Sequence, residues 1–141
     1  MKTKVQVKKE KTKIILDSNA FFVPLQFKMD IFEELKNLLS GNFEVIILSP
    51  VRRELEKLAE KGSPQMRKKA SYALKLSGKC TYVQLNDDYA CSPDDAILKV
   101  AKEWKSPVFT NDRNLRKRLR NINVPVIYVR QKSRLEIDGR L

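Results

Sequence analysis

The chain has 141 residues, 42% of them hydrophobic, which suits one ordinary domain whose core needs no disulfide or metal crosslinks. It contains no histidine, and its two cysteines fit no zinc-binding pattern, so Ser-His-Asp catalysis, Cys-His catalysis and histidine-ligated zinc or iron are excluded. The 29 basic and 17 acidic residues give a net charge of +12, which favours polyanions such as nucleic acid as partners.

The N-terminal residues are rich in lysine and lack the apolar stretch of a signal peptide. We therefore expect a basic N-terminal arm at residues 1–12, followed by a single domain at residues 13–141. No apolar run approaches the roughly 18–20 residues that a membrane span needs. We expect a cytoplasmic protein without a membrane partner.

The first predicted elements are a strand, a helix and a second strand. Residues Lys13–Asp17 predict a buried strand that ends in a carboxylate. Apolar residues at helical spacing from Ile31 to Leu39 predict a helix that ends at Gly41. The apolar run Glu44–Leu48 is the second predicted strand.

The middle of the chain predicts two consecutive helices. We expect Ser49 to cap the first of them, with Pro50 as its first residue. The break at residues 62–64 (Gly-Ser-Pro) starts the next helix, which Gly78 ends. Residues Thr81–Leu85 then predict a third strand.

A second cap-and-proline pair, Ser92-Pro93, predicts another helix start, with Asp95 in the capping-box position. The apolar residues of this helix recur at helical spacing and give it one buried face: Ile97, Val100, Ala101 and Trp104. The remaining predicted elements are a strand at Pro107–Thr110, a short helix at about Asp112–Arg120, a strand at Val126–Val129 and a short strand near Leu135–Ile137.

Short apolar strands that alternate with helices indicate a parallel sheet covered on both faces. With right-handed crossovers, the chain is expected to be of the α/β class, a three-layer α/β/α sandwich with a central parallel sheet. Ligands of such sheets bind beyond the carboxyl ends of the strands. Polar residues at those ends are therefore the candidates for a functional site.

Four carboxylates fall at that edge. Asp17 ends the first strand, Glu54 lies near the start of the helix after the second strand, and Asp94 lies in the first turn of its helix. From Asp94 that helix runs away for roughly 16 Å at 1.5 Å per residue. The next strand returns roughly 15–20 Å at about 3.3 Å per residue, so Asp112 should end near Asp94.

Like charges so close together raise their pKa values or require cations. Carboxylates without histidine bind hard cations, chiefly Mg²⁺ or Mn²⁺. The alternative is a salt-bridge network with neighbouring arginines, namely Arg52, Arg53 and Arg113. Each carboxylate by itself is compatible with a helix cap or a surface residue, but the four together favour a metal site.

The four segments resemble the motifs of the PIN domain family. The matching residues, in the family's order, are Ile14–Asn19, Ser49–Leu55, Asp94 with Ile97 and Ala101, and Phe109–Asp112. The resemblance implies a PIN-like nuclease domain that hydrolyses phosphodiester bonds of RNA with Mg²⁺ or Mn²⁺. By its motifs the catalytic residues are Asp17, Glu54, Asp94 and Asp112, of which Asp17, Asp94 and Asp112 would hold metal.

Asn19 and Thr110 match supporting polar positions of the family. Either Asp94 or Asp95 could occupy the third acidic position. The step of seven residues from Asp94 to Ala101 is the family's spacing, so we assign Asp94 to the site and leave Asp95 as a supporting helix cap.

Basic residues border two of the predicted carboxylates. The candidates for RNA binding through phosphate contacts are Arg52 and Arg53 beside Glu54, and Arg113, Arg116, Lys117 and Arg120 beside Asp112. For any single one of them a solvated helix face is the alternative.

Residues 111–120 resemble most the archaeal branch of the family that is related to ribosomal RNA processing nucleases and is also labelled as VapC-type toxins. The resemblance implies RNA as substrate, an antitoxin protein or ribosome-assembly factors as partners, and a homodimer. The sequence does not decide between toxin and processing nuclease. The rival functions are a non-catalytic RNA-binding protein that retains the fold and a phosphohydrolase or receiver domain, for which Asn19 is the wrong residue.

Overall fold

The computed structural model describes residues 11–86 and 92–141, so the predicted N-terminal arm lies outside it apart from its last two residues. The strands are β1 (Thr12–Leu16), β2 (Phe43–Leu48), β3 (Thr81–Val83), β4 (Val108–Phe109), β5 (Val126–Arg130) and β6 (Arg134–Asp138). The helices are the 3₁₀ helix η1 (Ser18–Phe22) and the α-helices α1 (Val23–Phe27), α2 (Ile31–Leu38), α3 (Ser49–Lys61), α4 (Pro64–Ser77), α5 (Pro93–Trp104) and α6 (Arg113–Asn121).

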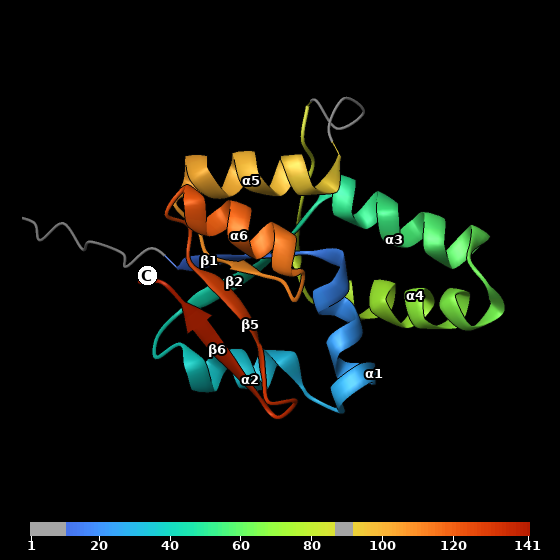
Figure 1. The fold of residues 1–141 in the computed structure, drawn as a ribbon. Helices are drawn as coiled ribbons and strands as arrows, with labels where there is room; N and C mark the ends of the chain where they lie inside the picture. Colours follow the sequence, from blue (N-terminus) through green and yellow to red (C-terminus); the bar gives the residue numbers. More distant parts are fainter. Residues whose placement is uncertain (1–10, 87–91) are drawn as a thin grey trace, which may run out of the picture.

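The strands form one sheet in the order β3-β2-β1-β4-β5-β6 (Figure 1). Strands β1 to β5 pair in parallel, as predicted. Strand β6 is antiparallel to β5, because only residues 131–133 separate the paired ends Arg130 and Arg134. A parallel connection needs a crossover of a dozen or more residues.

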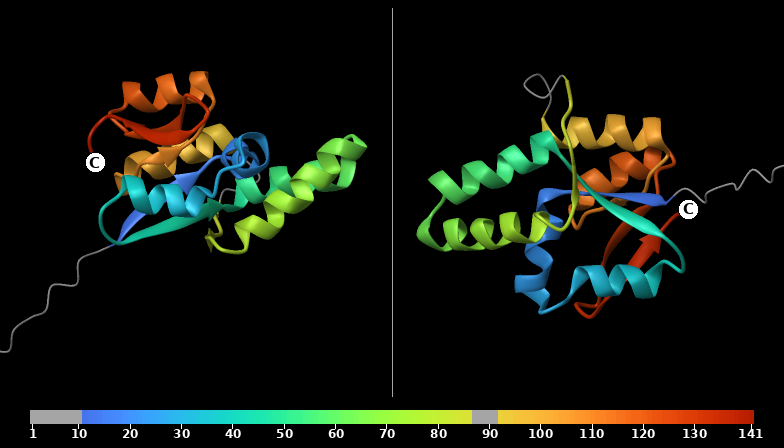
Figure 2. Two further views of the ribbon diagram at one scale, coloured as in Figure 1. Left: turned by 90° about the horizontal axis from the view of Figure 1, so that it is seen from below. Right: turned by 180° about the vertical axis from the view of Figure 1, so that it is seen from behind.

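Helices cover both faces of the sheet, which confirms the predicted three-layer arrangement. Helices α5 and α6 pack against each other on one face, and α2 lies on the other face against β6 (Figure 1). Helices α3 and α4 form an antiparallel pair that projects away from the sheet (Figure 2). No helix within the described ranges is both long and apolar enough to cross a lipid bilayer.

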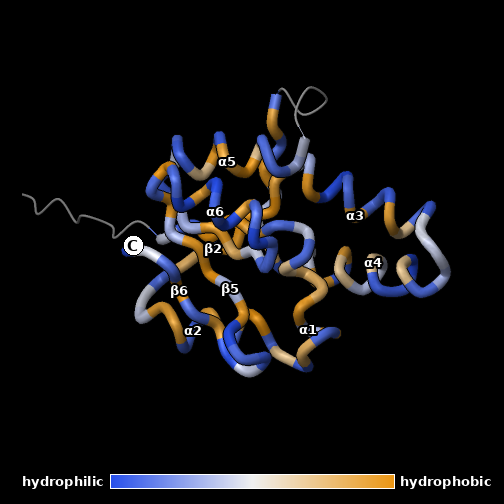
Figure 3. The backbone as a smooth tube through the Cα atoms, viewed as in Figure 1, coloured by the Kyte–Doolittle hydropathy of each residue, from blue (hydrophilic) through white to orange (hydrophobic). Residues whose placement is uncertain are grey.

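The core is centred on β1, whose Ile14, Ile15 and Leu16 are fully buried. Hydrophobic positions alternate with hydrophilic ones along α3 and α5 (Figure 3), so each helix has one apolar stripe that carries its buried residues. Burial of both faces of β1 explains why its sequence is a continuous apolar run rather than an alternating one.

Two local predictions differ from the structure. Ser49 does not cap α3: it is the first residue of the helix, and its hydroxyl accepts a hydrogen bond from the Leu85 amide at 3.0 Å. The segment between Asp17 and Asp30, for which no element was predicted, forms η1 and α1. These helices are only five residues long each, which is too short to show helical periodicity in the sequence.

Candidate active site

The centre of the sheet is a topological switch point. Strand β1 lies between β2 and β4, and the chain proceeds from β1 towards one edge of the sheet and from β4 towards the other. Ligands of open α/β sheets bind at the carboxyl ends of the two strands that flank such a point. Those two ends carry Asp17, directly after β1, and Thr110, directly after β4.

Asp17 is a buried carboxylate, with 3% of its surface exposed. Its Oδ1 accepts a hydrogen bond from the Ser18 amide at 2.8 Å. Its Oδ2 accepts bonds from Asn19 Nδ2 at 2.9 Å and from the Thr110 hydroxyl at 2.8 Å. Three donors from two chain segments therefore fix the orientation of one carboxylate.

The same network extends to the next carboxylate, Asp112. The Asp112 amide donates to the Thr110 hydroxyl at 3.0 Å, and the Asn111 amide donates to Asn19 Oδ1 at 3.0 Å. Asp112 is also the N-cap of α6, where its Oδ1 accepts the Asn114 amide at 2.8 Å. Asp17 and Asp112 are thus held in one hydrogen-bonded frame although 95 positions separate them along the chain.

Electrostatic interactions join the other two predicted carboxylates to this frame. Burial raises the pKa of Asp17 from 3.8 to about 6, hydrogen bonds from Thr110 and Ser18 oppose this rise, and the nearby charges of Asp94 and Glu54 add to it. Burial, followed by the charge of Asp112, also raises the pKa of Asp94. Electrostatic interactions therefore link Asp17 to Asp94 and Glu54, and Asp94 to Asp112.

The salt-bridge alternative is not supported at Arg52. The structure contains ion pairs that use other carboxylates: Glu56, Asp95, Glu136 and Asp138. Arg52, which was considered as a partner in such a network, lies 3.8 Å from Glu56 and stacks over the Tyr82 ring.

Comparison with known proteins bears directly on this arrangement. The family model described as a PIN like domain matches residues 14–132. The chain belongs to the PIN domain family. It is 36% identical to Ribonuclease VapC4 of Methanocaldococcus jannaschii over 90% of this chain and 97% of that protein.

Further similarities agree with this PIN fold. The chain is 24% identical to Ribonuclease VapC9 of Archaeoglobus fulgidus over 88% of this chain and 87% of that protein. The solved structure of the PIN domain endonuclease Utp24 is similar at a TM-score of 0.77 and 27% identity, covering 92% of both chains. The structure of VapBC2 from Rickettsia felis, at a TM-score of 0.61 and 17% identity, covers 84% of this chain and 99% of that one.

The donor chemistry of this PIN site suits a hard divalent cation, because all four candidate side chains offer carboxylate oxygens. Within the part of the chain that the structure describes, no three acidic or cysteine side chains are gathered closely enough to enclose a metal ion. Mg²⁺ is commonly bound by only one or two carboxylates together with water and substrate phosphates, so it does not require such a cage. The residues therefore fit a Mg²⁺ or Mn²⁺ ion shared with substrate.

Asp95, next to Asp94 in the sequence, pairs with an arginine of α6. It pairs with Arg118 of α6 at 3.0 Å, and this hydrogen bond lowers the pKa of Asp95. The adjacent Asp94 shows the opposite shift. The two adjacent aspartates thus differ in environment: Asp95 pairs with Arg118, and the pKa of Asp94 is raised by burial and by the charge of Asp112.

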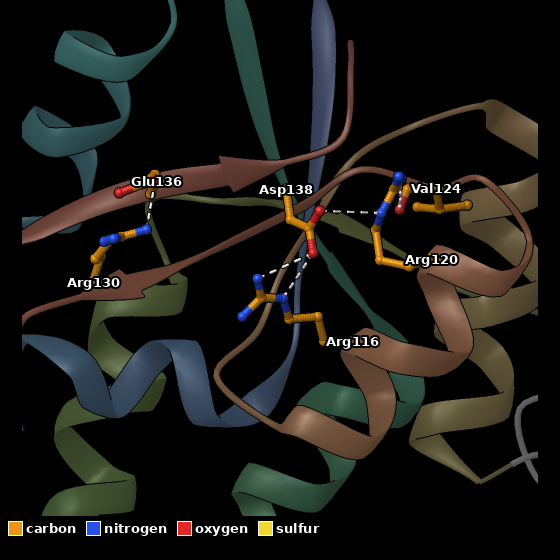
Figure 4. Close-up of polar contacts among 6 residues, drawn as sticks. All are labelled: Arg116, Arg120, Val124, Arg130, Glu136 and Asp138. Atoms are coloured by element: carbon orange, nitrogen blue, oxygen red, sulfur yellow. Dashed lines mark hydrogen bonds and ion pairs between the residues drawn. The ribbon is translucent and has the colours of Figure 1, made fainter.

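The predicted RNA-binding arginines divide into two groups. Arg116 and Arg120 both contact Asp138 of β6, at 3.0 and 3.3 Å, and so connect α6 to the sheet edge (Figure 4). Arg113 and Lys117 on the same helix are exposed. Arg53 is partly buried on α3, where the exposed Arg52 precedes it.

Sequence reasoning missed two residues that connect elements of this PIN domain. The Asn111 side chain accepts the Val129 amide at 2.9 Å and so links the turn after β4 to β5. Asp138 gathers two arginines from α6. Position 111 lay inside a matched motif and could have been selected for that reason, whereas Asp138 carried no signal, because its partners come from an element 18 or more positions away.

Proposed function

We propose that this PIN domain is an endoribonuclease that hydrolyses phosphodiester bonds of RNA with Mg²⁺ or Mn²⁺. The observation that carries the proposal is the buried Asp17 at the switch point, fixed by three hydrogen bonds and surrounded by the charges of Asp94 and Glu54. A carboxylate with a raised pKa is costly to keep ionised unless a cation joins it. The names of the relatives, Ribonuclease VapC4 and Ribonuclease VapC9, support RNA as the substrate.

In this proposal Asp17, Asp94 and Asp112 would hold one or two metal ions, each bound by one or two of these carboxylates together with water and substrate phosphate, and Glu54 is the fourth catalytic carboxylate. A bound Mg²⁺ or Mn²⁺ would stabilise charge on the scissile phosphate and lower the pKa of a bound water. Asn19 and Thr110 position Asp17 by donating to its Oδ2. Exposed cations beside the site, Arg113 and Lys117 among them, offset the repulsion between the acidic pocket and an incoming phosphate chain.

Partners other than RNA rest on the resemblance alone. An antitoxin protein or ribosome-assembly factors, and a second copy of this chain, remain expectations. RNA is the partner that both the net charge of +12 and the site support.

The direct test is cleavage of an end-labelled oligoribonucleotide by the purified protein. With Mn²⁺ or Mg²⁺ we expect internal cuts, and with EDTA we expect none. RNA binding without cleavage at any metal concentration would support the non-catalytic alternative and overturn the enzyme proposal.

Replacing Thr110 by Val tests the positioning role of its hydroxyl. We expect cleavage to fall about 10–100-fold, as for other groups that orient metal-binding carboxylates. The free energy of unfolding should fall by about 1–3 kcal/mol, because the partly buried Asp112 amide loses its acceptor. Thr110→Ser keeps the hydroxyl and is the matched control: equal cleavage by the Val and Ser variants would show that the hydroxyl does not position Asp17.

A further inference from the structure

A cavity of about 630 Å³ begins where the hydrogen-bond network of Asp17 ends. It lies between α1, the turn after β4 and the β5–β6 hairpin, and Thr110 and Asn111 form part of its wall. We call this cavity the hairpin groove. A chain that leaves the carboxylate site on the β5 side enters it directly.

The hairpin groove is strongly basic. None of its lining residues is acidic. Four of them are cationic, namely Arg113, Arg116, Arg130 and Lys132. Arg116 is held by Asp138 and Arg130 by Glu136, each at 3.0 Å (Figure 4). Within the described part of the chain Arg113 and Lys132 take part in no ion pair, and both are exposed. Two cations therefore shape the wall and two are available to an anion.

Aromatic and amide side chains complete the wall. The Arg116 guanidinium stacks on the Tyr128 ring at 3.8 Å, and Phe27 and Gln26 of α1 also line the groove. Planar rings and guanidinium groups next to cations are the composition of grooves that hold single-stranded nucleic acid.

The tip of the hairpin has an unusual backbone. Gln131 and Lys132 both adopt left-handed conformations, with φ of 54° and 61°, although neither is glycine. Such conformations cost on the order of 1–2 kcal/mol per residue, and glycine is the residue that avoids the cost. Lys132 thus has a charged side chain at a position where the backbone conformation favours glycine.

We propose that the hairpin groove binds the phosphate backbone of single-stranded RNA next to the bond that is cut, with Arg113 and Lys132 as its phosphate contacts. The inference rests on the proposed function for its substrate and adds the path and the residues that hold it. The carboxylate site repels a polyanion, and this basic groove includes Thr110 and Asn111, which belong to the hydrogen-bond network of that site. The RNA therefore runs over the β5–β6 hairpin.

The backbone at Lys132 gives a sharp experiment, because Lys132→Gly removes the cation while relieving the left-handed strain. Lys105→Gly is the matched control: this exposed lysine also has a positive φ, of 55°, but it lines a separate cavity that shares no lining residue with the hairpin groove. Binding of a fluorescent 12-nucleotide RNA is measured in EDTA, so that cleavage plays no part.

We expect Lys132→Gly to weaken binding about fivefold at 0.1 M salt and to lower the slope of log affinity against log salt by about 0.7, the value for one phosphate contact on a single strand. Adding Arg113→Ala should double the change in slope. Thermal unfolding should show Lys132→Gly to be no less stable than the wild type. Lys105→Gly should change neither affinity nor slope.

If Lys132→Gly and Lys105→Gly changed RNA affinity and salt slope equally, or if neither changed them, the proposal that RNA binds in the hairpin groove would be wrong. Lys132→Asn, which tolerates the same backbone and retains a side chain, guards against a result caused by a loosened hairpin. With Mn²⁺ present, Lys132→Gly should raise KM and leave kcat unchanged. If Lys132→Gly changes RNA affinity and salt slope as expected but the wild type never cuts RNA, the groove proposal is supported and the nuclease proposal fails. If the wild type cuts RNA and Lys132→Gly leaves KM unaltered, the nuclease proposal is supported and the groove proposal fails.

Discussion

Replacing Asp17 by Asn is expected to reduce cleavage by about 10³-fold or more and, in the absence of divalent metal, to make the protein more stable at neutral pH. The loss of activity follows from the removal of the negative charge that would hold the metal. The gain in stability follows from the burial of that charge, with 3% of the residue exposed.

The sign of the stability change comes from the pKa. Folding raises the pKa of Asp17 from 3.8 to about 6, mainly because burial disfavours the ionised form. The native state therefore binds a proton more tightly than the unfolded state, so the stabilising contribution is complete below pH 3.8 and is lost as the pH rises through 6. The difference between the folded and unfolded pKa of Asp17 changes the free energy of unfolding by about 3 kcal/mol at most. Asn cannot accept all three hydrogen bonds, so the net gain should be roughly 1–2 kcal/mol.

Thermal unfolding in EDTA at pH 4.5 and pH 7.5 measures this effect. The wild type should lose stability between the two pH values relative to Asp17→Asn, and Mg²⁺ should restore stability to the wild type only. Asp138→Asn is the opposite control, since it breaks the contacts to Arg116 and Arg120 and should destabilise the fold. A destabilised Asp17→Asn protein at pH 7.5 would mean that the hydrogen bonds outweigh the buried charge.

The position of Asp17 could be predicted because it depends on local sequence. An apolar run that ends in a carboxylate places that carboxylate at the carboxyl edge of a parallel sheet, wherever the strand lies in the order. The same holds for Thr110 and Asp112 at the end of β4. Strand lengths and helix rises are nearly constant, so the return of the chain to one edge follows from arithmetic.

What the sequence could not give are contacts that depend on how elements pair. Arg116 and Arg120 were predicted only as RNA ligands, because Asp138 lies on a strand whose direction and neighbour were unknown. Ser49 preceded a proline and so matched a cap, yet β2 continues directly into α3 and the hydroxyl bonds to the Leu85 amide instead. The contacts of such residues depend on their tertiary partners and not on local sequence preference.

The adjacent aspartates offer the second large effect. Asp94→Asn is expected to lower cleavage by about 10²–10³-fold, whereas Asp95→Asn should change it less than about threefold. The charge of Asp94 adds to the raised pKa of Asp17, and burial, followed by the charge of Asp112, raises the pKa of Asp94 itself. Asp95 is exposed and pairs with Arg118.

The two variants differ from each other by one position and carry the same change in charge, so the net charge of the protein and the dipole of α5 are affected alike. Initial rates with saturating Mn²⁺, together with the Mn²⁺ concentration for half-maximal rate, separate a lost metal ligand from a lost surface charge. Asp94→Asn should raise that concentration and Asp95→Asn should not. If Asp95→Asn proved the more damaging of the two, the third acidic position would belong to Asp95, and the pairing with Arg118 would have to break when substrate binds.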